Sequence, residues 1–163
     1  MDNKYVAMLD DAKSFADIFR LVKRVVEEHM GMHCAGLSLV LATLPNNMPA
    51  YHELGSNPII LNRALLEAIT GIARTRREVN SYVFAILLNE YLHTLGFTKE
   101  ESREYSKEII THLLTERLQA FKFASNPIHR IYPELKTMPI ARKLDEKPKV
   151  IKDFDAENAS YIG

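Results

Sequence analysis

The chain has 163 residues, the usual length of one domain, and its 47% hydrophobic and 26% charged residues are typical of a globular protein with a core. Its 21 Lys and Arg residues balance 21 Asp and Glu residues, which excludes binding of nucleic acid through a general basic field. Cys34 is the single cysteine, so neither an internal disulfide nor a cysteine-based zinc site can form. No apolar run approaches the roughly 20 residues of a membrane span, and the charged N-terminal segment does not resemble a signal peptide. We therefore expect a cytoplasmic protein.

The first part of the chain predicts a helix followed by two strands. Apolar residues recur at helical spacing over about 11–30, with Ser14 as a suitable start and Gly31 as a stop. The segment 35–45 is an apolar run of strand length without strict alternation, which indicates a strand covered on both faces. A loop rich in Pro and Asn then leads to a short second strand at 59–62.

The central part of the chain predicts a buried helix. After a weaker helix at 64–74, the segment 79–97 begins apolar on all sides, and a helix of that kind is buried on all sides. Gly96 is placed to end it. Thr98 and Glu101 have the spacing of a capping box, which predicts a long amphipathic helix from there to about residue 123.

From residue 124 onward the helical pattern is lost. Four prolines recur at short intervals and the segment 143–157 is mostly charged, so we predict a domain at 1–123 and an extended C-terminal tail at 124–163. The tail keeps seven large apolar residues as anchors: Tyr132, Leu135, Ile140, Val150, Ile151, Phe154 and Tyr161. They can dock on this domain, on a partner or on a second copy of the chain.

The polar end of the buried helix carries Asn89, Glu90 and His93. Residues four apart share one face of a helix, so Asn89 and His93 project together, with Glu90 beside them. In the H-E-x-x-H zinc site two histidines with this spacing bind the metal and the glutamate acts on its water. Here Asn89 takes the place of the first histidine. The segment NEYLHTLGF resembles the active-site helix of zincin metallopeptidases.

The resemblance extends loosely over residues 11–123, because zincin-like domains place a helix, a strand and an edge strand before the active-site helix. The phrase YHELGSNPIILN at 51–62 looks like the loop and edge strand that border the substrate cleft of such folds. The resemblance implies a single α+β domain of zincin-like type, with helices packed on a small sheet and the active-site-type helix at about 79–96.

The resemblance also implies roles for individual residues. Glu90 is the expected catalytic base and His93 the expected metal ligand. Asn89 stands at the other ligand position with only a neutral amide oxygen, and Lys99 falls at the third histidine position of the metzincin version. Four later residues are the alternatives for a third ligand: Glu104, Glu108, His112 and His129.

Other constellations of the sequence favour structural interpretations. The central motif also has the i, i+3 spacing of ferritin-like di-iron helices, but the chain contains no second Glu-x-x-His. Glu108 and His112 share one helix face, which we interpret as a solvated face. His29, His33 and Cys34 cluster near the end of the first helix with a spacing that matches no metal site.

Two functional hypotheses from different classes follow. In the first, a degenerate metallopeptidase-like domain without peptidase activity binds a peptide or protein partner along the edge strand and needs no cofactor. In the second, an atypical zinc-dependent hydrolase of peptidase type holds the metal with His93 and later ligands, and Glu90 activates the water. A homo-oligomer formed through the tail is a further expectation, whereas nucleic acid and membranes are not expected partners.

Overall fold

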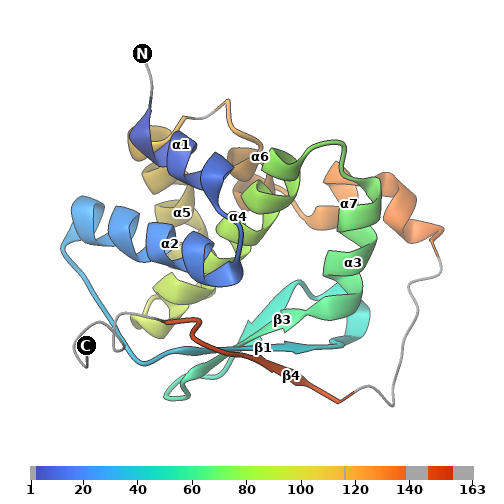
Figure 1. Ribbon diagram of the computed structural model, residues 1–163, viewed down its shortest axis with the longest axis horizontal. Helices are drawn as coiled ribbons and strands as arrows, with labels where there is room; N and C mark the ends of the chain where they lie inside the picture. The colour runs from blue at the N-terminus through green and yellow to red at the C-terminus, as the bar shows by residue number, and fades with distance from the viewer. Residues whose placement is uncertain (1–2, 116, 139–146, 156–163) are drawn as a thin grey trace.

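The computed structural model describes residues 3–115, 117–138 and 147–155 and shows a mixed α+β fold, which confirms the predicted class (Figure 1). Within these residues the helices are α1 (Lys4–Asp11), α2 (Phe15–Met30), α3 (Arg63–Ile72), α4 (Arg76–Thr94), α5 (Lys99–Leu113), α6 (Gln119–Ser125) and α7 (Ile128–Ile131). The strands are β1 (Ser38–Ala42), β2 (Ala50–His52), β3 (Pro58–Asn62) and β4 (Lys149–Ile151), and two 3₁₀ turns are η1 (Pro45–Asn47) and η2 (Pro133–Lys136). In the part of the chain that is described, no helix is both long and apolar enough to cross a membrane.

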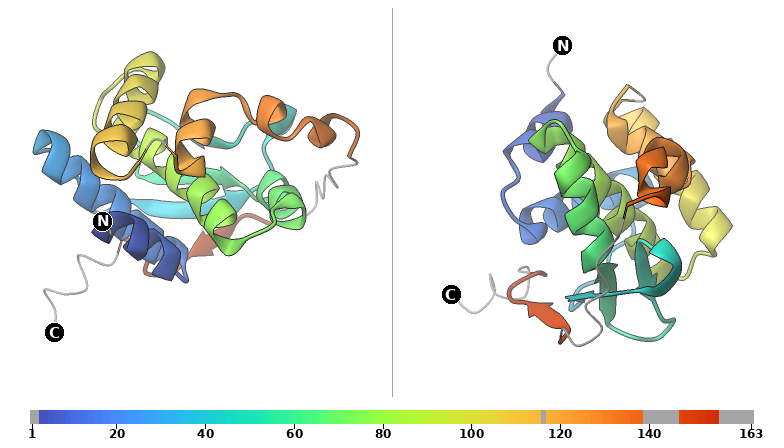
Figure 2. Two further views of the ribbon diagram at one scale, coloured as in Figure 1. Left: turned by 90° about the horizontal axis from the view of Figure 1, so that it is seen from above. Right: turned by 90° about the vertical axis from the view of Figure 1, so that its right-hand side faces the viewer.

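The four strands form one sheet in the order β2-β3-β1-β4. β1 and β3 are parallel, and the edge strands β2 and β4 run antiparallel to their neighbours. Leu39 and Leu41 of β1 are buried, whereas the residues that alternate with them are half-buried. The strand predicted at 35–45 is therefore present, but the expectation that both of its faces are covered was wrong. The described helices lie on one side of the sheet, so one face of β1 packs on the core (Figure 2).

Helix α4 runs through the middle of the helical layer, between α2 on one side and α5 and α6 on the other (Figure 2). The prediction of a central buried helix is confirmed, because Tyr82, Phe84, Leu88 and Tyr91 are wholly inaccessible to solvent. α4 begins three residues before the predicted start, since the Thr75 hydroxyl accepts a hydrogen bond from the Glu78 amide (3.2 Å) and caps the helix.

The predicted ends of the helices are formed by the expected side chains. Ser14 caps α2, and Gly31 ends it in the left-handed conformation at φ 69°. At the start of α5 the Thr98 amide donates to the Glu101 carboxylate (2.9 Å) and the Glu101 amide donates to the Thr98 hydroxyl (3.1 Å). These two bonds are the capping box that the sequence predicted.

The helix predicted to run from 98 to 123 is interrupted, and that prediction was wrong. α5 ends at Leu113, and a turn separates it from α6. The side-chain amide of Asn3 explains the break. Its Nδ2 donates to the carbonyl oxygens of Leu113 (2.9 Å) and Leu114 (2.8 Å), and these bonds satisfy the unpaired carbonyls at the end of the helix. The Asn3 side-chain oxygen also accepts from the amides of Tyr5 and Val6 and caps α1, a helix that the sequence analysis missed.

The described residues that follow α6 do not form the extended tail that the sequence predicted. Residues 128–136 form α7 and η2, and β4 joins the sheet beside β1. Of the predicted anchors, Tyr132, Leu135 and Phe154 are buried, whereas Val150 is 62% exposed on the open edge of β4. The anchors at positions 140 and 161 lie outside the described residues.

A buried ion pair ties the segment after β4 to α2. The Lys23 ammonium lies 2.7 Å from the Asp155 carboxylate, and the two side chains are 2% and 3% exposed. Asp155 also accepts a hydrogen bond from the Leu37 amide (3.1 Å), just before β1. Phe154 stacks on Phe19 with 4.2 Å between the ring centroids. Polar and apolar contacts thus fix this segment at the same place on α2.

Replacing Asp155 tests this attachment. Asp155→Asn keeps the size of the side chain and removes the buried carboxylate, which should lower the free energy of unfolding by about 3 kcal/mol. Urea denaturation followed by circular dichroism measures the change. The matched control is Asp153→Asn, an exposed position at φ 56° that asparagine tolerates, where we expect a change below about 0.5 kcal/mol. Equal effects at the two positions would contradict a role for the buried pair.

Candidate functional site

A cleft of about 510 Å³ lies where the polar part of α4 meets β2 and the first turns of α5. β2 and the turn before it contribute one part of the lining, and the segment 123–129 contributes another. The side chains of α4 that line it share one helical face: Tyr82, Ala85, Ile86, Asn89, Glu90 and His93. The lining therefore passes from apolar to polar along α4, with the polar residues at the end near β2.

The structure brings most of the site residues expected from sequence into this one cleft. Asn89, Glu90 and His93 line it from α4, and His129 lines it from α7. Lys99, at the expected position of a third histidine, lines it from the first turn of α5.

The other candidates for a third ligand lie elsewhere. Glu108 and His112 face the end of α2, where Glu108 lies 3.4 Å from the His29 imidazole. Glu104 is exposed and pairs with Lys107 (2.8 Å) on the surface of α5. None of the three lines the cleft.

His52, the last residue of β2, was not among the site residues predicted from the sequence. Its Nδ1 lies 3.0 Å from Nδ1 of His93, and the two rings meet edge to face at 5.2 Å between centroids. The other ring nitrogen, Nε2, lies 2.9 Å from the carbonyl oxygen of Ser56 in the turn after β2. A carbonyl only accepts hydrogen bonds, so Nε2 of His52 carries the hydrogen and Nδ1 presents its lone pair to His93. The signal available in the sequence was the Tyr-His-Glu phrase, which was predicted as part of the loop before an edge strand at 59–62. That prediction was wrong, because part of the loop forms β2 at the edge of the sheet and residues 59–62 belong to the interior strand β3.

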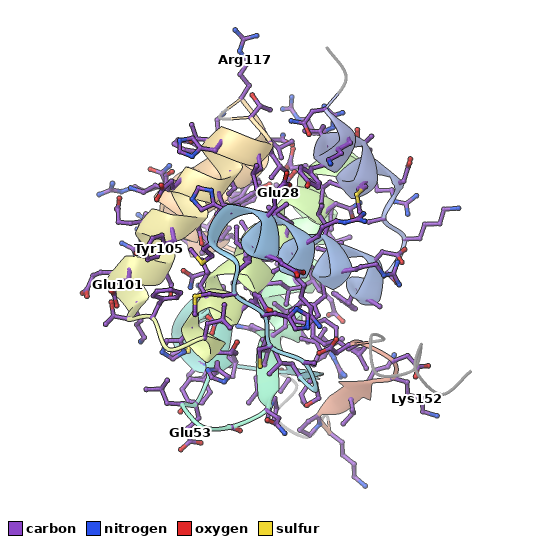
Figure 3. All side chains as sticks on the ribbon, turned by 90° about the vertical axis from the view of Figure 1, so that its left-hand side faces the viewer. Glu28, Glu53, Glu101, Tyr105, Arg117 and Lys152 are labelled. Carbon is purple, nitrogen blue, oxygen red and sulfur yellow. The ribbon has the colours of Figure 1, made fainter. Side chains whose placement is uncertain are left out.

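The turn that fixes His52 projects from the body of the protein. It contains Glu53 and Gly55, and its backbone is closed by a hydrogen bond from the Ser56 amide to the Glu53 carbonyl (3.0 Å). Figure 3 shows Glu53 at the tip of this turn, pointing away from the helices. Gly55 adopts φ 81°, a left-handed conformation that glycine allows without strain. The turn thus places the Ser56 carbonyl against the imidazole of His52.

Burial and nearby charges set the proton affinity of the polar end of α4. Burial raises the pKa of Glu90 to about 7, against the opposing effects of the Lys99 ammonium and a hydrogen bond with Asn89. The pKa of His93 is lowered, first by burial and then by His52 and Lys99. The pKa of Glu90 therefore lies near neutral pH, the condition in which proton transfer by a side chain is most efficient, whereas the lowered pKa of His93 favours its neutral form.

Three residues that line the cleft carry buried hydroxyl groups. The hydroxyls of Tyr82, Ser102 and Ser106 have no hydrogen-bond partner among the described residues, and all three side chains are buried. Burial is the main cause that raises the pKa of Tyr82, so its hydroxyl keeps its proton at physiological pH.

Arg76, Arg77 and Cys34 lie outside the cleft and have structural roles. Arg76 donates to the Ala12 carbonyl (2.7 Å), and Arg77 forms an ion pair with Asp10, so both tie the start of α4 to the end of α1. Cys34 is half-buried, and its backbone amide donates to the Tyr91 hydroxyl (2.9 Å). These contacts hold the loop before β1 and the N-terminal helix against α4.

No family model, curated protein or solved structure matches the chain. Function is therefore inferred from the residues and geometry of the cleft.

The raised pKa of Glu90 predicts a pH dependence of stability. Between pH 4.5, the ordinary pKa, and about 7, the folded state holds a proton that the unfolded state has released. Stability therefore falls as the pH rises through this window, by at most about 1.4 kcal/mol per pH unit. Glu90→Gln should flatten this slope in urea titrations, whereas Glu67→Gln on the exposed face of α3 should leave it unchanged. The same slope in the wild type and in Glu90→Gln would contradict the raised pKa.

Proposed function

We propose that this chain is a zincin-like domain of the degenerate metallopeptidase type, whose cleft binds an extended peptide segment of a partner protein. The observation that carries the proposal is the position of β2. This strand forms an edge of the sheet and lines the same cleft as Asn89, Glu90 and His93. A peptide that pairs with β2 would lie across the polar end of α4.

The backbone of β2 supports pairing with a further strand. The Asn62 amide donates to the Pro49 carbonyl (2.9 Å), and Ala50 lies opposite Leu61. In an antiparallel ladder this bond makes Ala50 and Leu61 a pair without mutual hydrogen bonds. By alternation, the N–H and C=O groups of Ala50 and His52 point to the open edge, while those of Tyr51 pair with β3.

Apolar side chains gather around this edge. Met48, Tyr51 and Leu54 are 38%, 44% and 68% exposed, and together they account for three of the five exposed large hydrophobic residues among those described. Met48 and Tyr51 line the cleft itself. Exposed apolar side chains that gather next to an open strand edge are typical of surfaces that bind another chain.

The donor set of the cleft favours binding over hydrolysis. His52 and His93 offer two imidazoles, and Asn89 offers a neutral amide oxygen. Among the described residues, no third His, Cys, Asp or Glu side chain comes close enough to the two imidazoles to complete a ligand set. Catalytic zinc sites use three protein ligands and one water. The cleft therefore has the surroundings of a peptidase site with an incomplete set of ligands.

Peptide binding can be tested by fluorescence polarisation. A labelled hexapeptide selected from a random array is titrated with the protein in the presence of EDTA, so that affinity does not depend on metal. Tyr51→Ala should weaken binding by about tenfold, the effect of losing one aromatic contact at the centre of an interface. Val150→Ala should leave the affinity unchanged, because Val150 is exposed on β4, the other edge of the same sheet.

Backbone methylation of the peptide separates strand pairing from side-chain contacts. If the peptide adds to β2, methylating alternate amide nitrogens should abolish binding at the positions that face the strand and leave it intact at the others. Equal effects of Tyr51→Ala and Val150→Ala, or no array peptide that binds, would refute the proposal.

A second candidate function is metal-dependent hydrolysis, and the His52–His93 pair favours it. Donors of a tetrahedral zinc ion lie roughly 3.3 Å apart at bond lengths of 2.0–2.1 Å, close to the 3.0 Å between the two Nδ1 atoms. The bond from His52 to the Ser56 carbonyl is also the outer contact that zinc-binding histidines make. The pair therefore fits a zinc ion, which would supply a Lewis acid for peptide hydrolysis. Glu90 would hold and transfer the proton.

A hydrolase makes a distinct prediction. The zinc-supplemented protein should cleave a quenched fluorescent peptide library, and Glu90→Gln should reduce the rate by at least about 100-fold, the usual contribution of a general base. Glu67→Gln again serves as the control. Cleavage that is unaffected by Glu90→Gln would reject this second function, and peptide binding without cleavage would leave the first proposal as the account of the cleft.

A further inference from the structure

A cluster of metal-binding side chains lies outside the cleft, where the end of α2 crosses α5. His29 is in the last turn of α2, and Glu108 and His112 are one turn apart on α5. One ligand atom of each residue lies within 4.8 Å of the other two. His29 Nε2 is 3.4 Å from the Glu108 carboxylate, and the rings of His29 and His112 are 5.5 Å apart. Figure 3 shows this end of α2, marked by Glu28, beside α5, marked by Tyr105.

We propose that His29, Glu108 and His112 form a binding site for a divalent transition metal ion of the zinc class. Two imidazoles and one carboxylate are a ligand set that zinc uses, with water in the remaining position. The separation of 3.4 Å between His29 and Glu108 agrees with the roughly 3.3 Å between donors of a tetrahedral ion. An ordinary ion pair accounts for His29 and Glu108 but not for the second imidazole that His112 brings to the same point.

The site is accessible from solvent. The side chain of Glu108 is 47% exposed and that of His29 is 16% exposed, so an ion can reach the donors without opening the core. Glu108 and His112 are four residues apart, which keeps them on one face of α5 regardless of side-chain motion. An ion at this point would join α2 to α5, and its ligands His29 and Glu108 are more than 70 positions apart in the chain.

The cluster shares no residue with the cleft. The residues of α5 that line the cleft are Lys99, Ser102, Arg103 and Ser106, which belong to the opposite side of the helix. Metal binding at the two places can therefore be separated by substitution. The proposed role of this ion is to hold α2 against α5, and it does not depend on what the cleft binds.

Zinc titration of the full chain by calorimetry tests the proposal, with chelated protein as the starting material. We expect one saturable site whose affinity falls by more than about tenfold in His112→Ala, since loss even of an outer partner of a metal ligand has that effect. Glu108→Gln should also weaken binding. His52→Ala, in the cleft, should retain the affinity of this site. His112 and Glu108 are exposed, so these variants keep the fold, and circular dichroism checks it.

Thermal unfolding provides a second measurement. Zinc at about 100 times its dissociation constant should raise the melting temperature by roughly 5–10 °C in the wild type and in His52→Ala, but not in His112→Ala. Zinc binding that is lost in His52→Ala and unchanged in His112→Ala would place the ion in the cleft and overturn the proposal. No saturable binding below millimolar zinc in the wild type would overturn it as well.

Discussion

The enclosure of α4 is the constraint on which the rest of the structure depends. Its middle part, residues 82–88, is apolar on every side, so it is stable only if other elements cover every side, and α2, α5, α6 and β2 are arranged around it. The sequence of the helix turns polar at Asn89 and Glu90, and the cover becomes incomplete there. The cleft is the region where packing around α4 stops and the polar side chains of its last turns meet β2. Burial at this boundary also raises the pKa of Glu90.

The two ends of the described chain complete this arrangement. Asn3 binds the carbonyls that end α5, and Asp155 pairs with Lys23 inside the fold, so residues far apart in sequence hold the helices around α4. The stacking of Phe154 on Phe19 adds apolar packing beside the second of these contacts. β4 forms one edge of the sheet through its pairing with β1, and β2 forms the other edge. Of these two edges, the edge formed by β2 lies beside the cleft.

Sequence patterns predicted the features that depend on neighbouring residues. They did not predict the features that depend on contacts between distant residues. The capping box of Thr98 and Glu101 and the burial of α4 were predictable because spacing within one segment determines them. The end of α5 was not, because Asn3, more than 100 positions away, provides the contact that ends it. His52 was missed for the same reason: its proximity to His93 follows from the pairing of β2 with β3 and from the packing of β2 on α4, neither of which spacing reveals.

Hydrogen exchange at β2 tests the central claim most directly, that the cleft beside α4 binds an extended peptide on this strand. Amide exchange measured by NMR, with and without a bound array peptide, should show new protection at Ala50 and His52, whose N–H groups face the open edge. The Tyr51 amide, which already pairs with β3, should change little. Protection confined to β4, or none in the sheet despite saturating peptide, would contradict the account.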